Sequence, residues 1–476
     1  MAEPTKQNST PGKRIILCLD GTFDDTADTA DRVNPGSFVS RLFRWILPPI
    51  FFMILWGLGV FPYWKKLERK LFGRPPTKTS FHTNVSLLAS AIQPLGDNNG
   101  ANQIPQLVIY IGGIGGVGTP QSRFEEAVTG NTMASKVRHA YRLIVDNYCE
   151  GDEIFLFGFS RGAFTARAIA GFIHCFGLLK KHYITQYFDE VWELYKDRKS
   201  TCERLEKECE QTSDGSELKN LRYQSNQIRC IGVWDAVGSL GAPPLWAPRR
   251  NNHQAIAEAS RARYKFFDPE LKDNVEYAFQ ALALDEQRFD FYPAVWSKPK
   301  DMKDPHFSQV WFPGVHTDVG GGRAGSVSRY AFIWMASKIQ EHGLLDLDVG
   351  LVKSISLELQ KTDEVPDRSP PWELEIGRNH WVYPFIGRLG YRKPHMPVGR
   401  LAGSERGGVV EQKFHWTVVN RIIRVPQYWI DCKALGKVDG SQASIELQET
   451  EDIKARQETS VLEDAILEKK WCPNTP

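Results

Sequence analysis

The sequence predicts an α/β fold with a mostly parallel sheet and helices on both of its faces. Short, nearly continuous apolar runs alternate with helical patterns, as expected for buried parallel strands joined by crossover helices. One run, 154–157, leads into Gly158-Phe159-Ser160-Arg161-Gly162 and then into an alanine-rich helical pattern. Two other runs, 228–234 and 309–312, are followed by an aspartate and by a glycine-rich loop with a histidine.

Length and composition are those of a globular protein with a large core. The chain has 476 residues, 42% of them hydrophobic, and its formal net charge of +2 does not indicate a nucleic-acid-binding protein. No CxxC pair or metal-type spacing occurs among the cysteines, and Cys18, Cys175 and Cys230 lie in apolar runs, so we expect reduced core thiols in an intracellular protein. Residues 1–13 are polar and predict a disordered leader without a signal peptide. Neither a metal nor a cofactor is implied.

The elements of a catalytic domain over residues 14–343 follow in order. The first strand spans 14–20 and ends at Asp20-Gly21-Thr22, and a capped helix begins at Thr83-Asn84. We then expect a strand over 107–111, a helix over 131–149, the strand 153–157, strands over 228–234 and 309–312, and helices over 273–285 and 328–341.

Two further segments differ from this alternating pattern. Residues 180–227 are charged and helical, which we interpret as a helical cap inserted into the domain. Residues 344–476 are less periodic, and we interpret them as a C-terminal extension with a charged, helical tail over 441–470.

Ser160 is the predicted nucleophile. A strand, Gly-x-Ser-x-Gly and a helix form the nucleophile elbow of an α/β-hydrolase, in which a strained turn projects the serine hydroxyl. Gly158 and Gly162 are expected where the strand and helix backbones converge. An ordinary strand–turn–helix connection is the alternative.

Asp235 and His316 are the predicted acid and base. The nucleophile needs a base that accepts its proton and a carboxylate that orients this base, and the chain order Ser, acid, His is that of α/β-hydrolases. Both residues follow predicted parallel strands, so they would meet Ser160 at one edge of the sheet. The alternatives for the acid are Asp285 and Asp318. Among the other histidines, His306 precedes its strand and is expected at the opposite end of the sheet. The remaining ones are interpreted as a packing residue, His174, and as solvated residues, His182, His253 and His342.

Acyl transfer also needs donors for the oxyanion. The backbone N–H of Arg161, directly after the nucleophile, is one candidate, and Gly21 or Thr22 after the first strand supplies the second. The glycine-rich run 112–119 is an alternative feature that could cradle a phosphate, but it lacks the Lys-Ser/Thr of a P-loop.

Seven motifs in order resemble one family. They are LDGT (19–22), TNV (83–85), GGVGT (115–119), GFSRGAFTAR (158–167), WDAVGSLG (234–241), ALALDEQR (281–288) and FPGVHTDVGGG (312–322). Over residues 13–343 the chain resembles the type VI secretion phospholipase-effector-like catalytic domain, an α/β-hydrolase family of bacteria and fungi. The resemblance implies a serine esterase that cleaves phospholipid acyl esters, with Ser160, Asp235 and His316 in the roles already inferred. Phe23, where the family usually has tryptophan, and the long insertion before TNV depart from the family pattern.

That insertion contains an uncharged segment, 45–64, between basic residues on both sides. It is long enough to span a bilayer, but a span would separate the first strand from the rest of the sheet, and its prolines would break a helix. We therefore expect residues 41–73 to form a re-entrant or interfacial hairpin whose basic collar favours anionic headgroups. A buried helix or a dimer surface is the alternative. The predicted membrane contacts are Trp45, Ile46, Leu47, Phe51, Phe52, Ile54, Leu55 and Trp56.

Together these features predict an intracellular serine hydrolase that is associated with the cytosolic face of a membrane in a monotopic or re-entrant manner. It is expected to cleave carboxylic esters of lipids as a phospholipase or lysophospholipase. The alternatives are a thioesterase or carboxylesterase attached to a membrane, and an inactive hydrolase fold that serves as an interaction module. The sequence does not predict the head group or acyl position of the substrate, the organelle or the oligomeric state.

Overall fold

The computed structural model of the chain describes residues 12–21, 82–98, 102–113, 131–196, 218–237, 271–288, 291, 293–299, 301–322, 327–357, 413–415, 417–418 and 457–458. The chain divides into two units, one of Met1–Asp24 with His82–Pro476 and one of Asp25–Phe81. The predicted hairpin 41–73 with its membrane contacts lies outside the described residues, as do residues 1–11 of the leader.

A nine-stranded sheet forms the core, in the order β2-β3-β1-β4-β5-β6-β7-β8-β9. β2 pairs antiparallel with β3, and the other neighbouring strands are parallel. The predicted α/β fold with a mostly parallel sheet is confirmed. The strands are β1 (Arg14–Leu19), β2 (Leu95–Asn98), β3 (Asn102–Ile111), β4 (Glu153–Phe159), β5 (Ile228–Trp234), β6 (Val275–Ala283), β7 (Phe307–Phe312), β8 (Lys413–His415) and β9 (Gln457–Glu458).

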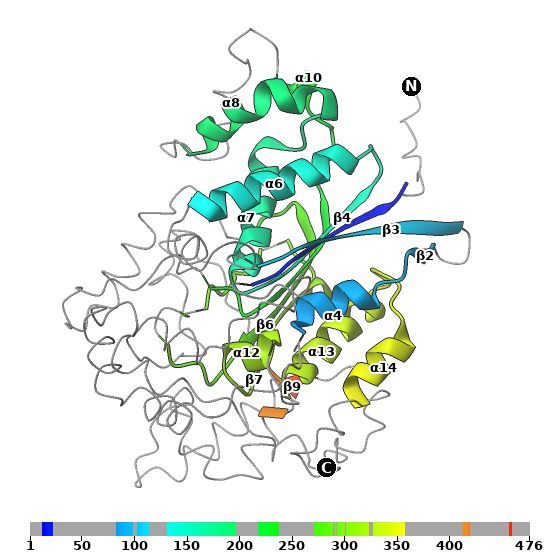
Figure 1. Cartoon of the computed structure of the whole chain (residues 1–476), viewed down its shortest axis with the longest axis vertical. Helices are drawn as coiled ribbons and strands as arrows, with labels where there is room; N and C mark the ends of the chain where they lie inside the picture. The colour runs from blue at the N-terminus through cyan, green and yellow to red at the C-terminus, as the bar shows by residue number, and fades with distance from the viewer. Residues whose placement is uncertain are drawn as a thin grey trace, which may run out of the picture. The chain divides into compact units, whose positions relative to one another are not determined.

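Helices cover both faces of this sheet (Figure 1). On one face lie α6 (Asn131–Asn147), α7 (Arg161–Phe176) and α8 (Ile184–Lys196), and on the other lie α4 (Asn84–Ala91), α13 (Val327–Glu341) and α14 (Val349–Leu357). Side chains of β1 alternate between them: Ile15, Leu17 and Leu19 pack in the first core cluster, and Ile16 and Cys18 pack in the second. Because both faces are covered, β1 reads as a continuous apolar run.

The described part of the predicted helical cap contributes to the first of these faces. It comprises the short helix η1 (Lys181–Tyr183), α8 and α10 (Leu218–Leu221), while residues 197–217 lie outside the described residues. α8 packs an aromatic side against α6 and α7, with the Trp192 ring 5.5 Å from Phe172 and the Phe188 ring stacked 5.3 Å from Tyr141. Among the helices that the structure describes, none has the length and apolar character needed to cross a bilayer.

The segment predicted as a helix over 273–285 is instead the strand β6, so this prediction was wrong. Its alanines and glutamine favour a helix by propensity, but β6 lies between β5 and β7 and is almost fully buried. Burial on both sides removes the polar alternation that would have identified a strand. As a result, Asp285 and Glu286 follow a strand end and belong to the carboxyl edge of the sheet.

The cysteines and the C-terminal extension give two further results. Cys18 and Cys230 are buried and free, as predicted, whereas Cys175 is disulfide-bonded, which corrects the expectation of a reduced thiol there. Disulfide pairing depends on which cysteines approach each other in the fold, and spacing along the chain does not encode that. Residues 413–415 and 457–458 of the extension add β8 and β9 to the sheet beyond β7. Residues 457–458 lie within the tail predicted to be helical, 441–470, so that prediction was wrong at these residues, which pair with β8 as a strand.

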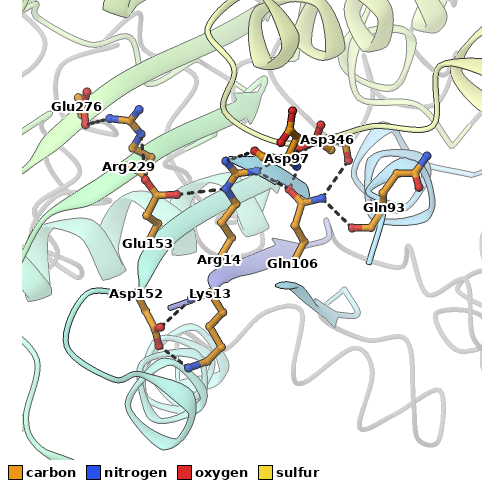
Figure 2. Close-up of polar contacts among 10 residues, drawn as sticks. All are labelled: Lys13, Arg14, Gln93, Asp97, Gln106, Asp152, Glu153, Arg229, Glu276 and Asp346. Carbon is orange, nitrogen blue, oxygen red and sulfur yellow. Dashed lines mark hydrogen bonds and ion pairs between the residues drawn. The ribbon is translucent and has the colours of Figure 1, made fainter. Parts of the chain in front are cut away.

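A network of charged and amide side chains joins the amino ends of the parallel strands (Figure 2). Arg14 at the start of β1 contacts Glu153 of β4, Gln106 of β3 and Asp346, at 3.1–3.2 Å. Arg229 of β5 continues the network to Glu153 and to Glu276 of β6. These contacts hold β1 in register at the amino ends of the strands. The predicted site residues lie at the opposite edge of the sheet, after the carboxyl ends.

Candidate active site

Ser160 lies in the sharp turn between β4 and α7. Its backbone has φ 57° and ψ −120°, a conformation that costs energy for a side-chain-bearing residue and persists where the surroundings impose it. Space at this turn explains the flanking glycines: a Cβ at Gly162 would lie 2.1 Å from the Leu19 carbonyl oxygen, and one at Gly158 would lie 2.7 Å from the Ala163 backbone. The close approach of β4, α7 and β1 therefore requires glycine at both flanking positions of the Gly-x-Ser-x-Gly motif.

The structure brings Ser160, His316 and Asp235 together in one chain of contacts. The Nε2 atom of His316 lies 2.8 Å from the Ser160 Oγ, and its Nδ1 atom lies 2.6 Å from the Asp235 Oδ2. His316 is the first residue of the short helix α12 (His316–Gly320), which follows β7, and Asp235 follows β5. Three residues separated along the chain thus meet at the carboxyl edge of the sheet, as their positions after parallel strands predicted.

The carboxylate of Asp235 is fixed by a hydrogen bond from the neighbouring strand β6, and its backbone has an unusual conformation. Its side chain is fully buried, and its Oδ1 accepts a hydrogen bond from the N–H of Ala283 at 3.0 Å, which leaves Oδ2 for His316. Asp235 has φ 42°, and within the described ranges it and Ser160 are the non-glycine residues with positive φ. Ser160 and Asp235 thus both have strained backbones, and His316 joins them through hydrogen bonds. Such strain is typical of a functional site.

The imidazole of His316 is buried and packs against two aromatic rings. Its ring centroid lies 4.7 Å from that of Phe159 and 4.8 Å from that of Phe291, which meets it edge-on. Burial lowers the pKa of His316 below its ordinary value, while the hydrogen bond and charge of Asp235 act in the opposite direction. At neutral pH the ring is therefore the neutral form, with Asp235 directing its remaining proton to Nδ1 and leaving Nε2 as the acceptor.

The alternative acids make different contacts. The Oδ2 of Asp285 accepts the Gly314 N–H at 2.5 Å, and the Oδ2 of Asp318 accepts the Val315 N–H at 3.0 Å. Both carboxylates thus hold the loop that carries His316, while Asp235 contacts its ring.

The alternative histidines lie elsewhere in the fold. His174 pairs with Asp273 at 3.2 Å, and His182 contacts Tyr183. His306 and His342 both contact the Tyr277 ring, and His306 precedes β7, at the end opposite His316. His253 lies outside the described residues.

Of the predicted oxyanion donors, Arg161 and Gly21 lie within the described residues. Arg161 is the first residue of α7, so its N–H belongs to the helix turn whose donors point out of the helix end. The N–H of Gly21 donates to the Asp20 carboxylate at 2.7 Å, and would have to exchange that bond for one to a substrate. Thr22 and most of the run 112–119 lie outside the described residues. The second donor stays a prediction.

Asp20 itself is a buried carboxylate next to the elbow. Besides Gly21, it accepts hydrogen bonds from the hydroxyls of Thr83 at 2.6 Å and Tyr110 at 2.5 Å. Burial raises its pKa to about 6, although these hydrogen bonds oppose the shift. Because Gly162 packs directly against the Leu19 and Asp20 carbonyls, the Asp20 cluster fixes the end of β1 beside the nucleophile turn.

Sequence reasoning missed three residues around His316, namely Glu286, Arg288 and Phe291. Glu286 accepts a hydrogen bond from the His316 N–H at 3.2 Å and pairs with Arg288, which lies over the Phe291 ring at 3.6 Å. The signal was present in ALALDEQR, but the assignment of a helix to 273–285 concealed that these residues follow a strand. Over the described ranges, no three His, Cys, Asp or Glu side chains gather as metal ligands.

Comparisons with known proteins identify the family to which this chain is similar. The family model described as T6SS, phospholipase effector Tle1-like, catalytic domain matches residues 73–338. A segment of 113 residues is 31% identical to the uncharacterized protein YEL023C of Saccharomyces cerevisiae, and this match covers 23% of the chain and 16% of the yeast protein.

Two solved structures also resemble the chain. One is the Tle1 effector bound to the VgrG spike from the type 6 secretion system, with 16% identity over 68% of this chain and 56% of that one, at a TM-score of 0.33. The other is an uncharacterized protein from Pseudomonas aeruginosa, with 14% identity over 97% of this chain and 62% of that one, at a TM-score of 0.37. The chain thus spans less than two thirds of either structure.

Proposed function

Since the chain belongs to the T6SS phospholipase effector Tle1-like catalytic domain family, we propose that it is a serine hydrolase that cleaves carboxylic esters of lipids. The observation that carries this proposal is the continuous hydrogen-bonded chain from Ser160 through His316 to Asp235. The family supports a phospholipase-type hydrolase, and the three side chains supply a chemical route for it.

In the proposed reaction, the Ser160 Oγ attacks the ester carbonyl carbon while the His316 Nε2 takes the hydroxyl proton. Asp235 stabilises the resulting imidazolium through Nδ1. The tetrahedral oxyanion is bound by the Arg161 N–H and a second donor near the end of β1. Collapse of this intermediate breaks the ester C–O bond, and the His316 Nε2 proton passes to the leaving alcohol. Water, deprotonated by His316, then hydrolyses the acyl-enzyme and releases the fatty acid.

The base has the properties that this route needs. His316 is buried and its pKa is lowered, so it is neutral and able to accept a proton at cellular pH. The Ser160–His316 distance of 2.8 Å is within direct transfer range. Its lowered pKa predicts that the activity extends below pH 6.5, the ordinary pKa of the imidazole.

A covalent probe and a lipid assay test the proposal together. The full chain is expected to release fatty acid from phosphatidylcholine vesicles, and a fluorophosphonate probe is expected to stop that release by modifying Ser160. Intact mass gives the stoichiometry, and peptide mapping locates the adduct. A probe that modifies no residue would favour the inactive interaction module. Turnover of a short soluble ester without turnover of vesicles would favour a general carboxylesterase.

We further propose that the uncharged segment 45–64, with its basic flanks, brings the enzyme to a membrane surface. It follows β1 closely in the chain, and the carboxyl end of β1 lies beside Ser160. Each methylene of an acyl chain that avoids water gains about 0.8 kcal/mol, so an enzyme held at a membrane surface would favour long acyl chains.

Deletion of residues 41–73 is expected to lower hydrolysis of anionic vesicles at least tenfold more than hydrolysis of a short soluble ester. The matched control is deletion of residues 1–11, which should leave the ratio of the two activities unchanged. Co-sedimentation with vesicles of phosphatidylcholine and phosphatidylserine reports binding directly. Equal losses on both substrates, with binding intact, would show that the segment serves folding and not membrane attachment.

A further inference from the structure

We propose that the ion pair of Glu286 and Arg288 is a positioning element of the site, which holds His316 through its backbone and presents a balanced charge to its imidazole. This inference rests on the proposed function, because it gives both residues a role in tuning the catalytic base. It concerns the carboxylate that accepts the His316 backbone N–H and the guanidinium that pairs with this carboxylate.

Glu286 is a buried carboxylate with a defined set of donors. Its side chain has no exposed surface, and it lies at the carboxyl end of β6, between the strands that carry Asp235 and His316. Its Oε2 accepts the His316 N–H at 3.2 Å and the Arg288 Nη2 at 2.8 Å. Its Oε1 accepts the Arg288 backbone N–H and Nε at 2.8 and 2.9 Å. A buried charge with these contacts is held in one place.

Arg288 extends this contact to the ring of the base. Its guanidinium lies 3.6 Å from the centroid of Phe291, and Phe291 meets the His316 ring edge-on at 4.8 Å. Glu286 thus holds the backbone of His316, and Arg288 holds the aromatic ring that packs against its imidazole. Both contacts limit the positions that Nε2 can take relative to the Ser160 hydroxyl.

The two charges act on the imidazole in opposite directions. The negative charge of Glu286 raises the pKa of His316, and the positive charge of Arg288 lowers it. The other charged groups near His316 in the described residues are Asp235, which contacts its ring, and Asp285 and Asp318, which bind the backbone of its loop. Because Glu286 and Arg288 carry opposite charges, removal of one charge removes its effect on the pKa of His316 and leaves the opposite effect of the other.

Removal of the negative charge of Glu286 and removal of the positive charge of Arg288 should therefore shift the pH profile of kcat/KM in opposite directions. In Glu286→Gln, which removes the negative charge and keeps one acceptor oxygen, the acidic limb of kcat/KM is expected to move down by about 0.5–1 pH unit. In Arg288→Gln the limb is expected to move up by a similar amount. Arg288→Lys keeps the charge and should restore the wild-type limb. Glu286→Ala also removes the backbone contact, and should lower kcat at least tenfold more than Glu286→Gln at unchanged KM.

The test measures kcat/KM for a soluble ester from pH 4 to 9, and in parallel the titration of ¹⁵N-labelled histidine in the full chain, with the His316 signal assigned by its loss in His316→Gln. Asp189→Asn, in an exposed ion pair of α8, is the control and should not shift either readout. Shifts of Glu286→Gln and Arg288→Gln in the same direction, or identical profiles for Arg288→Gln and Arg288→Lys, would overturn the inference. If the wild type hydrolyses no ester, the proposed function fails, and the histidine titration still decides this inference.

Discussion

Substitution of Ser160 by alanine is expected to lower kcat for ester hydrolysis by about 10⁴–10⁶-fold. The reason is local, because the hydroxyl that lies 2.8 Å from the His316 Nε2 is the only group that changes. Alanine and serine face the same strain at φ 57°, so the free energy of unfolding should change by less than about 1 kcal/mol. Fatty-acid release and thermal unfolding of the two proteins measure both quantities.

The matched control for this variant is Ser337→Ala. Ser337 is also fully buried, but its hydroxyl donates to the Ile333 carbonyl at 2.8 Å within α13. Its loss should leave kcat within about twofold and cost about 1 kcal/mol of stability. Labelling by a fluorophosphonate should disappear in Ser160→Ala and persist in Ser337→Ala. Undiminished hydrolysis in Ser160→Ala would rule out Ser160 as the nucleophile.

Replacement of Asp235 by asparagine is expected to lower kcat by about 10⁴-fold while KM stays nearly constant. The Ala283 N–H needs an acceptor, so the asparagine oxygen takes the place of Oδ1 and its amide NH₂ takes the place of Oδ2. Two donors cannot face each other, so His316 must carry its proton on Nε2. This tautomer donates to the Ser160 hydroxyl and cannot accept its proton.

Asp152→Asn is the control for this second variant. Asp152 is a buried aspartate that pairs with Lys13 at the opposite edge of the sheet, so its loss should affect stability and leave kcat unchanged. ¹⁵N chemical shifts of His316 report the tautomer directly. If Asp235→Asn kept more than a tenth of the activity while Asp285→Asn or Asp318→Asn lost it, the acid would be one of those two residues.

Much of the fold and site could be predicted because the relevant signals are local. A buried parallel strand is a short apolar run, and the residue after it lies at the carboxyl edge, so Ser160, Asp235 and His316 could be placed together from their positions alone. The N-cap at Thr83, whose side chain accepts the Ser86 N–H, could also be recognised from the local sequence.

What was missed depends on contacts between distant segments. β6 contains helix-forming residues and becomes a strand because β5 and β7 flank it. The disulfide of Cys175 and the pairing of residues 413–415 with β7 have no local signature. Glu286 could be assigned no role until β6 was known to end before it, since a carboxylate after a helix and one after a buried strand face different surroundings.

The pairing of β7 with β8 also bears on biosynthesis. One edge of the catalytic sheet is completed by residues 413–415, and these in turn by 457–458. A ribosome must therefore translate well beyond β7 before this edge can close, and during that interval the nascent strand presents open N–H and C=O groups to other chains. The interval makes the unfinished polypeptide a natural client for chaperones, however stable the finished protein is.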